Sequence, residues 1–285
     1  MILWKFIYSF HMPLFMFCSG LVFKFENTSI ANSVLVVKKR FMGLILPYLG
    51  MGAFAYILLD KFAPYWYLYT LFVFYTITLV IYLIMSKFKW WQGVCGSGCL
   101  LILGLLVQIL CSKLKNHEIV PLLDFSHFGL FFFFCLGIVF KKHQMFKYCG
   151  SKFFSIITVF FFVLFLQKFN MIHFPNIHFL HIFLSRLYTL SAIMFFYTLF
   201  LNVEKGNMFR YFEKIGLISL EIYILHPFFL PKFSFFENIF NSFDLRSSIL
   251  TQFFVSLLLS LPLIGFCSVL TKIPKSPLRK VLFGK

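Results

Sequence analysis

Residues 10–20 read FHMPLFMFCSG and lie inside an apolar run from about Ile2 to Phe23. A run of this length is typical of a helix that spans a membrane. His11 and Pro13 in its middle are costly there, because hydrocarbon offers neither water nor spare hydrogen-bonding groups. Two interpretations are open: a kinked helix in which His11 bonds to a neighbouring helix, or an intramembrane functional site.

The composition extends this interpretation to the whole chain. Of its 285 residues, 61% are hydrophobic and only 12% are charged, which is about half the charged share of ordinary globular proteins. The sequence therefore predicts an all-α polytopic membrane protein with one domain over residues 1–285. We expect about nine transmembrane helices, over residues 3–23, 41–59, 66–86, 94–112, 127–140, 153–167, 179–201, 216–231 and 249–270. The fifth and sixth of these are short.

The basic residues indicate an orientation. Eighteen lysines and arginines fall in the odd-numbered loops and the C-terminal tail, and seven fall in the N-terminus and the even-numbered loops. The positive-inside rule then places the C-terminus in the cytoplasm and the N-terminus outside. We attribute the net charge of +17 to basic residues that orient the helices in the membrane and contact its anionic lipids. Nucleic-acid binding is not expected, because no basic groove interleaved with aromatic residues is visible.

A second informative stretch, residues 216–227, reads GLISLEIYILHP. On a helix, Ser219, Tyr223 and His226 share one face, whereas Glu221 points elsewhere. Such a polar stripe inside a span either bonds to neighbouring helices or forms a site. With the predicted orientation, both His226 and His11 lie in the outer half of the membrane or near its midplane. We therefore expect the two histidines to line one cavity.

Other basic residues have two interpretations each. Lys38, Lys39 and Arg40 precede the second predicted span, where they either anchor it on the cytoplasmic side or bind phosphate groups of a ligand. Arg186 lies near the outer end of the seventh span, where it either snorkels to the headgroups or meets an anionic substrate.

A metal site is not expected from the sequence. Among His173, His178 and His181, only the last two have helical spacing, and Pro175 interrupts the helix.

These stretches resemble a known family. FHMPLFMFCSG resembles the HMPLFFFISG signature of the acyltransferase-3 family of integral membrane acyltransferases, many of which O-acetylate surface sugars. Residues 216–227 resemble the family's late signature, G-x-x-S-L-x-I-Y-x-x-H-P. Residues 40–48, RFMGLILPY, are similar to its R-x-x-x-x-L-x-P-Y stretch. Weaker likenesses begin at Tyr65 and Phe128.

The resemblance implies a chemistry. The chain would move an acyl group, expected to be acetyl, from acyl-CoA to a hydroxyl of a cell-surface or exported glycan or a lipid-linked sugar, in the bacterial inner membrane. No permanently bound cofactor is expected. We expect His11 and His226 to be catalytic, and Lys39 and Arg40 to bind the donor. The residues expected to bind the acceptor are Arg186, Ser219, Tyr223 and Glu221.

One departure from the family pattern leaves an alternative open. The family fold has ten core spans, and its first span carries a basic residue and a histidine thought to be the catalytic base. This chain is expected to be short by that span, so His11 does not take over the missing role by default. The alternative is a non-catalytic remnant or a flippase-like membrane binding protein.

Overall fold

In the computed structural model, the described part of the chain consists of helices and the short turns that join them, and it contains no strand. The all-α fold class is therefore confirmed for these residues. The described residues are 2–24, 30–59, 65–88, 91, 93–114, 125–145, 147, 156, 158–160, 187, 189–198, 207–229, 249–270 and 283.

Five of the predicted segments agree with observed helices to within two residues at each end. They correspond to α1 (Ile2–Val22), α4 (Trp66–Met85), α5 (Val94–Leu114), the pair η3 (Phe125–Leu130) and α6 (Phe131–Lys142), and α13 (Ile249–Leu270). Within the seventh segment, Thr189–Thr198 is a short apolar helix. Most of the sixth segment lies outside the described residues.

Three of the described helices are long and apolar enough to cross a membrane: Asn32–Ile57, Trp66–Met85 and Val94–Cys111. Trp66–Met85 and Val94–Cys111 contain no charged residue, as a hydrocarbon environment requires, whereas Asn32–Ile57 carries three cations, Lys38, Lys39 and Arg40, in its first half. The number of nine spans and the cytoplasmic C-terminus stay predictions.

The second segment differs from the prediction. Its helix begins at Ile30 rather than at residue 41, so Lys38, Lys39 and Arg40 form the last turn of α2 (Ile30–Arg40) and not a loop. The helix continues through a π-helical turn, η1 (Phe41–Ile45), into α3 (Leu46–Leu59). Pro47 has no backbone N–H to donate to the carbonyl of Gly43. The Leu46 N–H bonds to the carbonyl of Phe41, five residues earlier, which is the π-helical pattern. Such π-turns are frequent at functional sites.

The eighth predicted segment, 216–231, contains a break at Ile218. Its first two residues end α10 (Asn207–Leu217), and most of the rest forms α11 (Ser219–Phe229). Residues of α10 expose both large apolar and charged side chains, such as Tyr211, Leu217 and Lys214. That mixture is typical of a helix at a membrane surface.

The chain divides into two compact units. Unit 1 consists chiefly of Ser29–Thr76 and Glu204–Lys285, and unit 2 of Ile2–Thr28 and Ile77–Val203. The boundary falls within α4. The prediction of a single domain over residues 1–285 stays a prediction.

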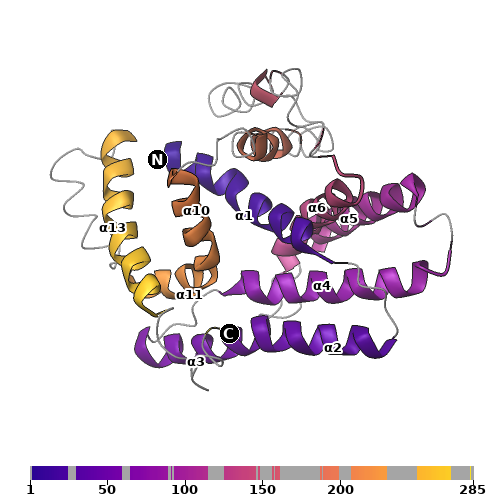
Figure 1. The fold of residues 1–285 in the computed structure, drawn as a ribbon, viewed down its shortest axis with the longest axis horizontal. Coiled ribbons are helices and arrows are strands. Elements are labelled where there is room, and N and C mark those ends of the chain that lie inside the picture. The colour runs from indigo at the N-terminus through magenta and orange to yellow at the C-terminus, as the bar shows by residue number, and fades with distance from the viewer. Residues whose placement is uncertain are drawn as a thin grey trace. The chain divides into compact units, whose positions relative to one another are not determined.

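Unit 2 is organised around the packing of α1 on α6. Figure 1 shows α1 crossing α6, with α5 alongside α6. The core is made of phenylalanines: Phe17 is fully buried and meets the rings of Phe140 and Tyr197 edge-on at 5.5 and 5.8 Å. Phe10 stacks on Phe196 at 4.8 Å. The stretch that includes residues 10–20 therefore supplies much of this core.

Two glycines allow α1 and α6 to approach closely. A Cβ added at Gly20 would overlap the Phe134 carbonyl oxygen, and one added at Gly137 would overlap the Phe17 carbonyl oxygen. In a membrane, where lipid is as apolar as the helix surface, small residues at the interface let backbones pack and gain van der Waals contact. The glycine that ends the FHMPLFMFCSG stretch is thus required for helix packing.

In unit 1, the rod formed by α2, η1 and α3 lies beside the first half of α4 (Figure 1). Rings join the two: Phe41 meets Phe72 at 5.9 Å and Tyr48 meets Tyr69 at 6.0 Å. Helix α11 packs against α13 and reaches α3 through Phe54 and Phe228, whose rings are 5.7 Å apart. Helix α11 therefore lies among α3, α13 and the start of α4.

The close approach of α1 and α6 gives a stability prediction. Gly137→Ala should lower the free energy of unfolding by about 1–3 kcal/mol, because the added methyl group has no room and the backbones must move apart. Thermal unfolding of the purified protein in detergent measures this. Gly98→Ala is the matched control, because a Cβ at Gly98 of α5 meets nothing within 4 Å. Equal melting temperatures for the two variants would contradict the packing described.

Candidate active site around His226

His226 is held in a defined tautomer by its own helix. Its Nδ1 lies in hydrogen-bond contact with the carbonyl oxygen of Tyr223, one turn earlier on α11. Because a carbonyl can only accept, Nδ1 must carry the proton, and the neutral ring then keeps a lone pair on Nε2. The side chain is half-buried. An imidazole in this state has the form that a general base needs.

Aromatic rings surround this histidine. The Tyr223 ring is 5.6 Å from the His226 ring, and the Tyr67 and Tyr65 rings lie 5.4 and 6.2 Å from that of Tyr223. The Tyr223 hydroxyl oxygen also accepts a hydrogen bond from the backbone N–H of Tyr67. Aromatic walls with a few fixed polar groups are typical of small-molecule sites.

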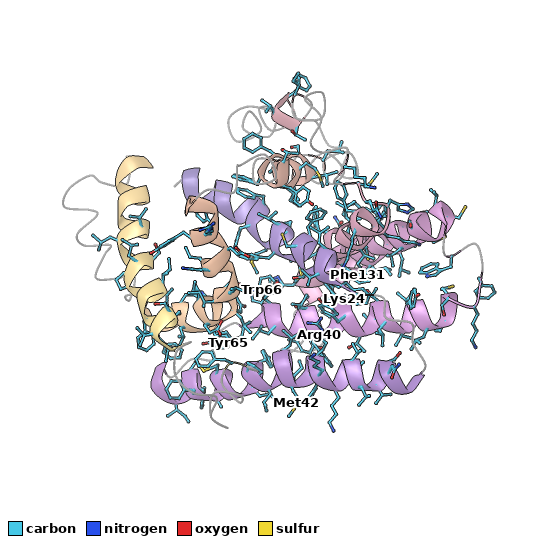
Figure 2. All side chains as sticks on the ribbon, in the orientation of Figure 1. Lys24, Arg40, Met42, Tyr65, Trp66 and Phe131 are labelled. Atoms are coloured by element: carbon cyan, nitrogen blue, oxygen red, sulfur yellow. The ribbon has the colours of Figure 1, made fainter. Side chains whose placement is uncertain are left out.

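Tyr65 attaches the start of α4 to α11. Its hydroxyl donates a 2.9 Å hydrogen bond to the carbonyl of Ile224, and its side chain is only 1% exposed. Burial raises the pKa of Tyr65 to about 12, so the hydroxyl stays a donor at physiological pH. Figure 2 labels Tyr65 and its neighbour Trp66 at this end of α4. The position of His226 therefore depends on a residue that is distant in sequence.

Sequence reasoning did not include Tyr65 or Tyr67 among the site residues. The signal was present in the aromatic cluster Tyr65-Trp66-Tyr67 that opens the third segment. Nothing in the sequence alone, however, pairs that cluster with a helix more than 150 residues later.

The other predicted residues of α11 have different environments. Ser219 is exposed at the first position of the helix. Glu221 is 1% exposed and lies near Cys267 of α13, close enough for an electrostatic interaction. It thus points away from the face that carries Tyr223 and His226, as expected from helical spacing. Its predicted contact with the acceptor, like that of Ser219, stays a prediction.

Of the predicted donor-binding residues, Arg40 is held in place and Lys39 is exposed. The guanidinium carbon of Arg40 lies 4.4 Å from the centre of the Tyr75 ring, a cation–π contact that fixes the side chain against α4. Lys38 and Lys39 extend from the same turn with exposed side chains. Figure 2 labels Arg40, with Met42 of the π-turn that follows it.

The two remaining predicted residues lie elsewhere. His11 belongs to α1 in unit 2 and is half-buried, while His226 belongs to unit 1. The expectation that both line one cavity stays a prediction. Arg186 lies outside the described residues, as do His173, His178 and His181.

Comparison with known proteins gives one result. The family model described as an acyltransferase domain matches residues 1–270, which is nearly the whole chain and includes every residue of the candidate site. Searches of curated proteins and of solved structures each gave no match.

The bond between Tyr65 and α11 gives a second stability prediction. Tyr65→Phe should lower the free energy of unfolding by about 1 kcal/mol, because a buried hydrogen bond is lost without any change of shape. Tyr56→Phe is the control, since Tyr56 of α3 is 59% exposed. Differential scanning fluorimetry compares the two variants. A melting temperature of the Tyr65 variant equal to that of the control would show that the bond does not stabilise the fold.

Proposed function

Because the chain belongs to the acyltransferase-3 family, and is a membrane acyltransferase in that general sense, we propose that it transfers an acetyl group from acetyl-CoA to a hydroxyl of a glycan. The acceptor is a cell-surface or exported polysaccharide, or a lipid-linked sugar. The membrane is the bacterial inner membrane, with nine spans and a cytoplasmic C-terminus. The observation that carries the proposal is the His226 tautomer within a cluster of tyrosines.

The proposed reaction begins at Nε2 of His226. This nitrogen takes the proton of the sugar hydroxyl while the hydroxyl oxygen attacks the thioester carbonyl carbon. The carbon–sulfur bond breaks as the ester forms. The coenzyme A thiolate leaves and takes the proton back from the imidazolium, so the enzyme returns to its starting state. His11 is the second candidate for a catalytic group.

The tyrosine cluster supports a sugar acceptor. Tyr65, Tyr67 and Tyr223 provide apolar faces, and the Tyr223 and Tyr67 side chains are half-buried and close to His226. A sugar has both apolar C–H faces and hydroxyls, and such aromatic surroundings suit it better than a charged site would. In the proposal, Ser219 and Arg186 add polar contacts to the acceptor.

Lys39 and Arg40 support an acyl-CoA donor. Both are in the last turn of α2, and Arg40 is already fixed by Tyr75, so little side-chain entropy would be lost when it binds a phosphate. Cationic side chains bind phosphate oxygens by charge-assisted hydrogen bonds. The π-turn that follows directly is of the kind often found at functional sites.

The proposed activity is tested with the purified full chain in detergent. Radiolabelled acetyl-CoA and a mixture of bacterial surface glycans should give label in the glycan fraction, and alkaline treatment should release it, because the bond formed is an oxygen ester. Palmitoyl-CoA in place of acetyl-CoA tests the donor. Absence of transfer from either donor would contradict the proposal and favour a non-catalytic membrane protein.

The donor site gives a separate kinetic prediction. Lys39→Gln should raise the KM for acetyl-CoA by about tenfold with little change in kcat, because a charge-assisted contact to the donor is lost in ground and transition states alike. Lys214→Gln in α10 is the matched control, since it removes an equally exposed charge from the same unit. Initial rates over a range of acetyl-CoA concentrations measure both. A fall in kcat at constant KM would remove Lys39 from the donor site.

A further inference from the structure

Unit 2 contains a cavity of about 210 Å³ that the acyl-transfer proposal does not use. It lies where the end of α4, the start of α5 and the end of α6 come together. The residues of its lining that matter here are Trp91, Ser97, Leu100, Ile138, Val139 and Lys142. Both chain segments at this end, after α4 and after α6, are predicted from their lysines to be cytoplasmic.

Lys142 brings a positive charge to the cavity. Its ammonium group donates a 3.0 Å hydrogen bond to the carbonyl of Trp91, which fixes the side chain and leaves two N–H donors. The Lys142 side chain as a whole is exposed, but desolvation next to the protein lowers its pKa, because it disfavours the charged form. An anion bound next to it would offset that cost.

No carboxylate is present to serve as that anion in the described part of unit 2, which contains neither aspartate nor glutamate. Unit 2 carries further cations near the cavity, at the C-terminal ends of α4 and α6. Lys87 follows α4, Lys141 precedes Lys142 and donates to the Phe23 carbonyl at 3.0 Å, and Lys147 lies five residues on. Among the described residues, the charge around the cavity is therefore of one sign.

Ser97 and His143 form a second polar group at the cavity. The Ser97 hydroxyl and Nε2 of His143 are 2.8 Å apart, and Ser97 is 5% exposed. This bond ties the first turn of α5 to the residue that directly follows Lys142. It holds the cationic end of α6 against the cavity, so the site is formed before any ligand binds.

We propose that this cavity binds the phosphate headgroup of an anionic phospholipid from the cytoplasmic leaflet, with Lys142 as its charged partner. The rest of the lining is mostly apolar, as shown by Trp91, Leu100, Ile138 and Val139. A lipid presents a phosphate together with a glycerol and acyl chains, which matches a cation beside apolar walls. Basic pockets between membrane helices on this side bind such headgroups.

The volume agrees with this ligand. At roughly 30 Å³ for each water, 210 Å³ corresponds to the space of about seven water molecules. That space suits a phosphate with part of its glycerol, while the acyl chains stay outside. The lipid proposal does not depend on acyl transfer. If lipid binding is not found, the proposed acyltransferase function is unaffected.

Native mass spectrometry of the full chain in a neutral detergent tests the site. Titration with phosphatidylglycerol should give a one-lipid complex, and phosphatidylcholine should give much less of it. Lys142→Gln should weaken phosphatidylglycerol binding by about tenfold, the effect of one charge-assisted hydrogen bond. Lys147→Gln, which removes an exposed charge outside the lining, should leave binding unchanged.

A second variant keeps the test independent of charge. Val139→Phe should fill the cavity and also reduce lipid binding, whereas Lys142→Arg should preserve it; melting temperatures establish that each variant is folded. Equal losses for Lys142→Gln and Lys147→Gln would overturn the proposal in favour of diffuse attraction. Displacement of the lipid by an equal concentration of coenzyme A, without displacement by inorganic phosphate, would overturn it in favour of a donor site.

Discussion

The backbone contact between α1 and α6 at Gly20 and Gly137 is the constraint on which unit 2 depends. It brings Phe17 into contact with Phe140 and Tyr197 and aligns the end of α1 with the end of α6, where Lys141 bonds to the Phe23 carbonyl. Larger residues at either glycine would separate the helices. The end of α6 that lines the cavity therefore rests on the same contact.

In unit 1, a single buried hydrogen bond has a comparable role. Tyr65 joins the start of α4 to α11 beside the residues that carry the candidate chemistry. The hydrogen bond between His226 and Tyr223 then selects the ring tautomer. Scaffold and chemistry are thus coupled: the hydroxyl of one tyrosine positions a helix, and the carbonyl of another determines which nitrogen can act as a base.

The sequence was sufficient for much of the fold because long apolar runs have only one common solution, the helix. It also predicted the face shared by Tyr223 and His226, since helical spacing is a local property. The prediction failed at Arg40, because the helix begins before the cations rather than after them, and at Ile218, where a break between α10 and α11 interrupts the expected span. A cluster of cations indicates where a helix leaves the membrane, but it does not end the helix itself.

The contacts that the sequence did not predict are long-range. The bond from Tyr65 to Ile224, the pair formed by Ser97 and His143, and the Lys142 contact with Trp91 each join distant positions of the chain. No periodicity encodes such pairs, because they depend on how helices pack and not on which residues are helical. The residues of both the candidate active site and the proposed lipid site were therefore only partly predictable.

The central claim is that Nε2 of His226 acts as the base in acyl transfer. The most direct measurement is the initial rate of acetyl transfer by His226→Asn, because the asparagine amide can still donate to the Tyr223 carbonyl but offers no imidazole nitrogen. We predict a rate lower by about 100-fold or more, with the melting temperature unchanged. A folded variant that keeps the wild-type rate would contradict the claim and leave His11 as the remaining candidate.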